Sequence, residues 1–443
     1  MIMSLTHIEY GFDWHEYRDN IYAELHSRPF KIISSDAHIS HVALLTNDKE
    51  KQQQRQHLLS LLKQLDIDVE RIEGSCQVYQ GKDFIIRYEN HLEFSTLTIT
   101  DTAIKTSASE PFAQTALHRL PHCWFTDFPG KTIAAFHIQV NFNKVASFPK
   151  PQQLKPAFDH KLMVGSFPQH GAAQVWTSFH THDDNFGRFL IFNHHMSKGQ
   201  MGRMVQRIIE IETYRLMAML GFMEARALTP KLASMDHTLA DITDQLANGP
   251  ASHDDDLLKA LTDLAATIEA IRAKTTFRFN ASLAYHGVMI ARINELKEDE
   301  VSGHLTIKEF LTRRLTPAVN SCSNAQDRLE NLSKRVNRAS DMLRTRVELS
   351  IQSQNQQLLS SLERRSRLQL ALQHTVEGLS VAAISYYTVG LIKYLTDAIY
   401  NAGFVINKPM IMGITVPLII GGVWFMTKRV HKKIRTLAHT RNL

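Results

Sequence analysis

The stretch 377–426, EGLSVAAISYYTVGLIKYLTDAIYNAGFVINKPMIMGITVPLIIGGVWFM, decides the architecture of this chain. It contains two apolar segments, one from Leu379 to Leu395 and one from Met410 to Met426. Each is about 17 residues long, at the lower end of what spans a bilayer as a helix. The pattern predicts a hairpin of two transmembrane helices. The alternative is a buried helical hairpin of a soluble domain.

Basic residues on both sides of the hairpin predict its orientation. One cluster precedes the first segment and another follows the second: Arg364, Arg365 and Arg367, then Lys428, Arg429, Lys432, Lys433 and Arg435. The loop 396–409 carries one acid, Asp397, and one base, Lys408. Because Lys and Arg are retained on the cytosolic side of a membrane, we expect both termini in the cytosol and the loop outside. The basic clusters suit an anionic lipid surface.

Small residues recur in the hairpin at intervals of four. Gly378 and Ala382 share one side of the first helix, and Gly413, Pro417 and Gly421, each four apart, share one side of the second. Small side chains let membrane helices approach closely. They predict either packing of the two helices on each other or assembly of several chains. Hydroxyl side chains in the first helix leave a pore as an alternative, although such groups more often bond to the helix itself.

Composition narrows the class of protein. The chain has 443 residues and a formal net charge of +6, too mild and too clustered near the hairpin to indicate a nucleic-acid-binding face. Its three cysteines form no CxxC pair, which favours a reducing compartment over a disulfide framework. The first twenty residues lack the basic and apolar regions of a signal peptide.

Residues 1–197 are predicted to form a cytosolic α+β domain with a mixed, mostly antiparallel sheet. Alternating apolar and polar residues predict strands at 38–46, 84–88, 92–100, 132–141, 161–165, 173–180 and 186–192. Leucines at helical spacing predict a helix over 48–66 with Asp48 as its cap. The short spacing between strands argues against a doubly wound sheet.

After residue 197 the apolar period becomes helical. Two coiled-coil-like seams, 228–246 and 257–271, are separated by Asn248-Gly249-Pro250 and predict an antiparallel helical hairpin within 198–316. Pro317 should break or kink the chain, and a stalk helix over 317–377 should start near Asn320. The transmembrane hairpin, 378–427, and a basic cytosolic tail, 428–443, complete the predicted organisation.

The best candidate for chemistry is a histidine cluster. His180 and His182 share a face if the chain is extended there, and Asp183 follows, so the three could bind Zn or Mn. The same residues also read as a turn, since Asp183-Asp184-Asn185 is good turn chemistry. Neither a phosphate-binding loop nor a hydrolase or protease motif is present, and no catalytic residue or cofactor is predicted.

Three strings carry a resemblance to a known family. They are ELHSRPF at 24–30, VQRIIEIETYRL at 205–216 and TVEGLSVAAISYY at 375–387. Together they resemble a family of uncharacterised bacterial membrane-anchored proteins, domain of unknown function 3422, over nearly the whole chain. The resemblance implies a protein of the bacterial inner membrane. It supplies no catalytic residues.

The architecture alone is similar to that of CorA-type magnesium channels. Those channels carry a Gly-Met-Asn motif at the end of the first membrane helix, where this chain reads Lys393-Tyr394-Leu395-Thr396-Asp397. We therefore expect a membrane-anchored, homo-oligomeric scaffold or sensor whose cytosolic domain binds a ligand or a protein partner. A CorA-like divalent cation channel and a metalloenzyme at the cytosolic face are the alternatives.

Overall fold

The computed structural model describes residues 14–19, 21–22, 31–67, 69, 74–104, 110–142, 147–403 and 407–439. The ELHSRPF motif therefore lies outside the described residues, as do the side chains of most of the basic tail. The chain divides into two compact units, Met1–Ser340 and Asp341–Leu443. Each unit is described by itself.

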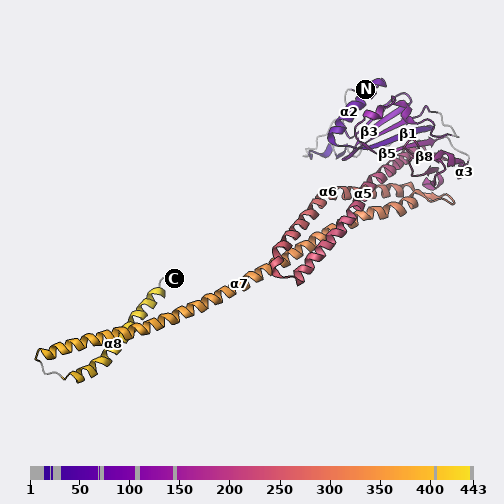
Figure 1. The fold of residues 1–443 in the computed structure, drawn as a ribbon. Coiled ribbons are helices and arrows are strands. Elements are labelled where there is room, and N and C mark those ends of the chain that lie inside the picture. Colours follow the sequence, from indigo (N-terminus) through magenta and orange to yellow (C-terminus); the bar gives the residue numbers. More distant parts are fainter. Residues whose placement is uncertain are drawn as a thin grey trace. The chain divides into compact units, whose positions relative to one another are not determined.

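A mixed sheet forms the body of the first unit (Figure 1). Within the described residues it has nine strands in the order β2-β3-β4-β1-β5-β8-β7-β6-β9, and every neighbouring pair is antiparallel except β5 and β8. The strands are β1 (Ala37–Leu45), β2 (Cys76–Gln80), β3 (Phe84–Asn90), β4 (Phe94–Asp101), β5 (Lys131–Asn141), β6 (Val164–Phe167), β7 (Ala173–Thr177), β8 (Gly187–Asn193) and β9 (Asp299–Glu300). The predicted α+β class is confirmed.

Each face of the sheet is covered by a helix. Helix α2 (Asp48–Gln64) packs Leu58, Leu61 and Leu62 into one buried cluster with β1, β3 and β4. Asn47, not Asp48, caps this helix, because its side chain accepts from the Glu50 amide while the Glu50 side chain accepts from the Asn47 amide. The predicted cap was wrong by one residue, since only Asn47 lies in the extended conformation that a cap requires.

Two long helices cross the first unit in opposite directions. Helix α5 (Lys198–Asn248) covers the second face of the sheet, and α6 (Asp254–Leu296) returns alongside it (Figure 1). Most leucines of both seams are buried, among them Leu232, Leu239 and Leu261. The short elements are α3 (Pro151–Leu154), α4 (Pro168–Gly171) and 3₁₀ turns at Ala116–Arg119, Trp124–Asp127, Lys155–Phe158 and Ala251–His253.

Helix α7 (Ile307–Asn401) begins earlier than predicted. Thr306 and Glu309 form reciprocal side-chain to backbone bonds that define its start. Pro317 lies inside the helix and does not end it. Leu315 and Val319, on either side of the proline, are fully buried in the main core, and this packing offsets the loss of one backbone bond.

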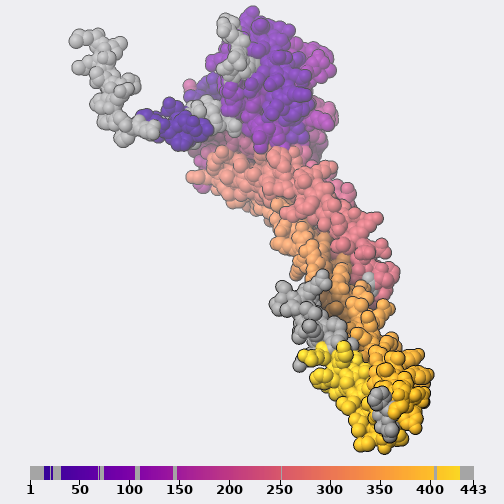
Figure 2. Space-filling model, turned by 90° about the vertical axis from the view of Figure 1, so that its left-hand side faces the viewer, coloured from indigo at the N-terminus to yellow at the C-terminus, as the bar shows by residue number. Residues whose placement is uncertain are grey.

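The second unit contains the end of α7 and helix α8 (Lys408–His439), which runs back beside α7 (Figures 1 and 2). Lys408 donates to the Asp397 carboxylate at 2.9 Å and closes the turn between them. Among the described helices, these two contain stretches long and apolar enough to cross a membrane. Only 6% of the apolar stretch in α7 and 0% of that in α8 is buried. The core hairpin of a soluble domain would be mostly buried, so these values do not fit that alternative.

Candidate functional site

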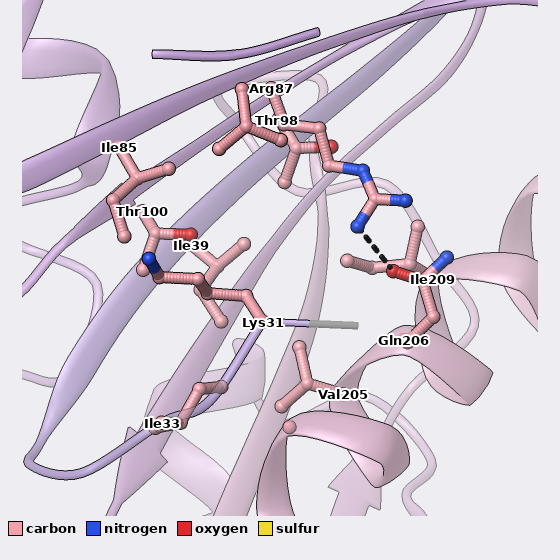
Figure 3. A pocket seen from close by; sticks show the side chains of 12 residues that line it. Lys31, Ile33, Ile39, Ile85, Arg87, Thr98, Thr100, Val205, Gln206 and Ile209 are labelled. Atoms are coloured by element: carbon pink, nitrogen blue, oxygen red, sulfur yellow. Dashed lines mark hydrogen bonds between the residues drawn. The ribbon is translucent and has the colours of Figure 1, made fainter. Parts of the chain in front are cut away.

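A mostly apolar cavity of the first unit lies between helix α5 and the sheet. It is about 230 Å³ in volume, and strands β1, β2, β3 and β4 form one wall while α5 forms the other (Figure 3). We call it the α5 cleft. Its floor is mostly apolar and is made by Ile33, Ile39, Val78, Ile85, Val205 and Ile209.

Strand alternation and one glycine shape the α5 cleft. Ile39 and Ile85 point to the α5 side, because alternate residues of a strand share a face. Gly202 brings the backbone of Lys31 against the helix, since a Cβ at this position would lie 1.9 Å from the Lys31 carbonyl oxygen. The Ile33 amide donates to the Lys198 carbonyl at 3.3 Å and fixes the same segment.

Two cations, Lys31 and Arg87, and no carboxylate line the described wall of the α5 cleft. Arg87 donates to Glu89 at 2.8 Å and, more weakly, to Gln206 at 3.5 Å (Figure 3). The Arg87 and Glu89 side chains are only 9% and 8% exposed. Burial alone would raise the pKa of Glu89, but the adjacent guanidinium outweighs burial and lowers it.

A smaller hollow of about 50 Å³ adjoins the α5 cleft and shares Gln206 and Ile209 with it. His41 lies in its wall and makes hydrogen bonds with Thr98 at 2.8 Å and with Thr213 at 3.1 Å. Complete burial lowers the pKa of His41 to about 3, so the ring is neutral near pH 7. The wall of this hollow therefore combines the neutral imidazole of His41 and the hydroxyl of Thr213 with the carboxylates of Glu89 and Glu210.

A chain of polar contacts leads from the α5 cleft along α5 to α6. Gln206 donates to Glu210 at 2.9 Å, and Arg292 of α6 donates to Glu210. Glu295 accepts from Arg292 at 2.7 Å and from Arg207 at 2.8 Å. The polar residues of the string 205–216 thus hold α5 to α6 as well as to the sheet.

The structure does not gather His180, His182 and Asp183 as metal ligands. His182 is buried, while His180 and Asp183 are exposed in the turn between β7 and β8. Among the residues that the structure describes, no group of three or more His, Cys, Asp or Glu side chains is placed to hold a metal ion. The stretch forms a turn, which was the alternative interpretation, because the Asn185 amide donates to the His182 carbonyl at 2.8 Å.

His182 has a different set of partners. Its Nδ1–H donates to Asp159 at 2.5 Å, and the Ser178 hydroxyl donates to its Nε2 at 3.1 Å. The hydrogen-bond chain Ser178–His182–Asp159 resembles a serine nucleophile with its histidine base. Ser178, however, is only 1% exposed and its Oγ also accepts from the His180 amide, so these bonds hold the turn.

The predicted helix-packing residues lie on the surface of the second unit. Ala382 is exposed, and a Cβ built on Gly378, Gly413 or Gly421 meets nothing within 4 Å. These positions are therefore not where α7 and α8 touch. The ends of the predicted spans, Leu379, Leu395, Met410 and Met426, are also exposed within this unit.

The α5 cleft was not among the predicted sites. A signal existed in FIIRYEN, 84–90, where Ile85, Arg87 and Glu89 alternate onto one face. A charged pair on a face that should be buried marks a polar site beside a core. The sequence does not show that Gln206, which lies 119 positions away, meets Arg87 there.

Fold and site together define an α+β protein with a ligand-sized cleft in its first unit and two membrane-length apolar helices in its second. The chain belongs to the family described as "Protein of unknown function (DUF3422)", which matches residues 13–434. No curated protein matches it.

Proposed function

We propose that this protein is a membrane-anchored sensor whose first unit binds a small amphipathic anion in the α5 cleft. One observation carries the proposal: an apolar cavity whose described lining contains two cations, Lys31 and Arg87, and no acid. An apolar body would rest on the isoleucines, and a carboxylate would meet the cationic groups. Because Arg87 already pairs with Glu89 at 2.8 Å, Lys31 supplies the charge that this pair leaves unbalanced, and the Arg87 guanidinium would add directed hydrogen bonds to the ligand.

The volume indicates the size of the ligand. At about 230 Å³, the α5 cleft exceeds the roughly 150 Å³ of a cavity that holds benzene. It is smaller than the roughly 300–1,000 Å³ typical of drug-sized ligands. A short acyl or aromatic carboxylate fits this range, and each buried methylene contributes about 0.8 kcal/mol.

Calorimetric titration of the full chain in an uncharged detergent tests this proposal. Octanoate should bind with one-site saturation, and octanol, which has the same tail without the charge, at least tenfold more weakly. Lys31→Gln should weaken octanoate binding severalfold, and Val205→Phe, which fills the floor, should abolish it. Val288→Phe, at an exposed position of α6, is the matched control and should bind as the wild type does. Equal affinity for octanol and octanoate would contradict an anion site.

We propose further that the hairpin spans a bacterial inner membrane with both termini in the cytosol. The support is the pair of basic flanks around two apolar helices. A reporter that is active only outside the cytosol should be silent when fused at the C-terminus and active when inserted at Gly403. The reverse pattern would overturn this topology.

We also propose that the chain self-associates through coiled-coil contacts of α7, as a scaffold would. Leu358, Leu359 and Leu362 are each about three-fifths exposed within the second unit, at 62%, 64% and 58%. Exposed leucines on one helix favour pairing with another copy. Leu358→Cys should form a disulfide-linked dimer on mild oxidation, while Gln356→Cys on the same segment should do so far less. Equal cross-linking of both would indicate random collision.

A further inference from the structure

We propose a second binding site, for a small phosphate-bearing anion, in the hollow between the start of α5 and the end of α6. This α5–α6 hollow has a volume of about 240 Å³. Its described lining holds three cationic side chains and one carboxylate: Arg203 and Arg207 from α5, Lys297 after α6, and Glu295. Among the residues that the structure describes, the hollow and the α5 cleft share no lining residue.

The one carboxylate in the described lining, Glu295, is already neutralised. Glu295 accepts from Arg207 at 2.8 Å and from Arg292 at 2.7 Å. Burial alone would raise its pKa, but the two guanidiniums outweigh burial and lower it. With Arg292 and its second partner Glu210 included, four cations surround two carboxylates, so the described side chains keep a positive excess that favours an anionic ligand.

The carbonyl groups at the end of α6 would repel an anion, and Gln169 covers them. Its side-chain amide donates to the carbonyl of Glu295 at 2.9 Å and to that of Leu296 at 3.2 Å. Gln169 and Lys297 hold φ angles of 51° and 49°, in the left-handed region that non-glycine residues seldom adopt. Backbone strain at the two residues that border the hollow is consistent with a fixed, preformed wall.

The opposite wall adds favourable electrostatics. Helix α5 begins at Lys198, and Arg203 and Arg207 follow within its first three turns. The N-terminal end of a helix carries a partial positive charge, which acts with these side chains.

Phosphate suits this arrangement better than a carboxylate does. Its several oxygens can accept from cations that converge from two helices, whereas a carboxylate offers two. The same chemistry is presented by a free phosphorylated metabolite and by a phospholipid headgroup.

The test uses the full chain in an uncharged detergent, with pyrophosphate and short-chain phosphatidic acid as separate calorimetric probes. We expect one-site saturation by at least one of them, and a loss of at least tenfold in affinity for Arg203→Glu and for Lys297→Glu. Both residues are exposed, and thermal unfolding of each variant, followed by circular dichroism, should match the wild type. Pyrophosphate binding identifies a soluble ligand, and binding of phosphatidic acid alone identifies a headgroup.

Arg226→Glu makes the same charge change farther along α5, at an exposed position outside the hollow, and serves as the matched control. It should leave binding unchanged. Saturation by neither probe would overturn the proposal. An equal loss in Arg226→Glu would also overturn it, because it would reduce the effect to overall surface charge.

Discussion

At the scale of single residues, His41 is a neutral polar group on the α5 side of the sheet, beside the charged pair of Arg87 and Glu89. Its ring joins Thr98 of β4 to Thr213 of α5, so it connects the sheet to the helix through two neutral hydrogen bonds. A neutral imidazole in this position is compatible with an apolar cavity next to it. Protonation would place a charge where burial has removed water.

We therefore predict that His41 makes the first unit acid-sensitive. The folded-state pKa of about 3 lies below the unfolded value of about 6.5. The neutral ring contributes stability that is complete above pH 6.5 and is lost as the pH falls toward 3. The loss at pH 5 should be about 2 kcal/mol.

Urea unfolding followed by tryptophan fluorescence measures this effect. His41→Gln should be less stable than the wild type at pH 7, and the gap should shrink by about 2 kcal/mol at pH 5. His180→Gln, at an exposed position, controls for the loss of one histidine. If the difference in unfolding free energy between the wild type and His41→Gln is the same at pH 7 and pH 5, His41 does not make the first unit acid-sensitive.

Gly202 is the second residue on which the cleft depends. Gly202→Ala should force the Lys31 segment away from α5, because the added Cβ would meet the Lys31 carbonyl at 1.9 Å. We expect a loss of about 1–3 kcal/mol in unfolding free energy. Gly287→Ala in α6, where an added Cβ meets nothing within 4 Å, should instead be neutral or stabilising by up to about 1 kcal/mol. Similar effects of both substitutions would show that the close contact is not what matters at Gly202.

At the scale of elements, α5, α6 and α7 approach one another around Gly221. Its amide donates to the Ser282 hydroxyl at 3.1 Å. An added Cβ would lie 2.4 Å from Ser282 Oγ and 3.0 Å from Cys322 Sγ. Cys322 is fully buried there, and burial raises the pKa of its thiol to about 11.

Thiol labelling should report this helix crossing. In a background with Cys76→Ser and Cys123→Ser, Cys322 should react with a maleimide only slowly, because a buried thiol with a raised pKa presents little thiolate. Gly221→Val should speed labelling at least tenfold by forcing the helices apart. Gly287→Val is the control, with open space around its Cβ, and should label at the wild-type rate. Fast labelling of the wild type would show that the crossing opens by itself.

Elements with a strong period were predictable, and those that depend on tertiary contacts were not. The two helices α5 and α6 and the stop after Asn248 were predicted correctly, because apolar periodicity and turn residues are local signals. Strand β9 has two residues and exists only through its pairing with β6. The start of α7 was placed too late, because burial around Pro317 overrides the local preference of proline.

The sites also differ in this way: those marked by local sequence were predictable, and those that depend on tertiary contacts were not. The apolar hairpin consists of two continuous stretches of sequence, so their length and composition reveal it. The α5 cleft joins residues 31–33, four strands and a helix, and only the folded sheet brings them together. The histidines at 180 and 182 were correctly placed near a turn, but alternation did not reveal that one would point inward to Asp159 and the other to solvent.

At the scale of the whole molecule, the exposed apolar surface of the second unit leads to a test of membrane insertion. Leu418 and Ile420 of α8 are 68% and 49% exposed. The double substitution Leu418→Lys and Ile420→Lys should move the chain from the carbonate-resistant membrane fraction toward the soluble fraction. Each charge at the centre of a span costs about 2.5–3.5 kcal/mol.

The control for this insertion test is Leu258→Lys together with Met223→Lys, at exposed apolar positions of the first unit. That variant should stay in the membrane fraction. Exposed positions of a soluble protein tolerate lysine with little effect. If carbonate fully extracts the wild-type chain from the membrane fraction, the proposed transmembrane hairpin is wrong.

The sheet ends at β9, whose residues Asp299 and Glu300 are both acidic and both exposed. A strand of two residues offers few free backbone groups, and its carboxylates oppose the approach of another chain. This edge is therefore a poor template for strand addition, the route by which many domains capture extended peptides. A protein that recognises the first unit at this end would have to read side chains on its helices and loops rather than extend its sheet.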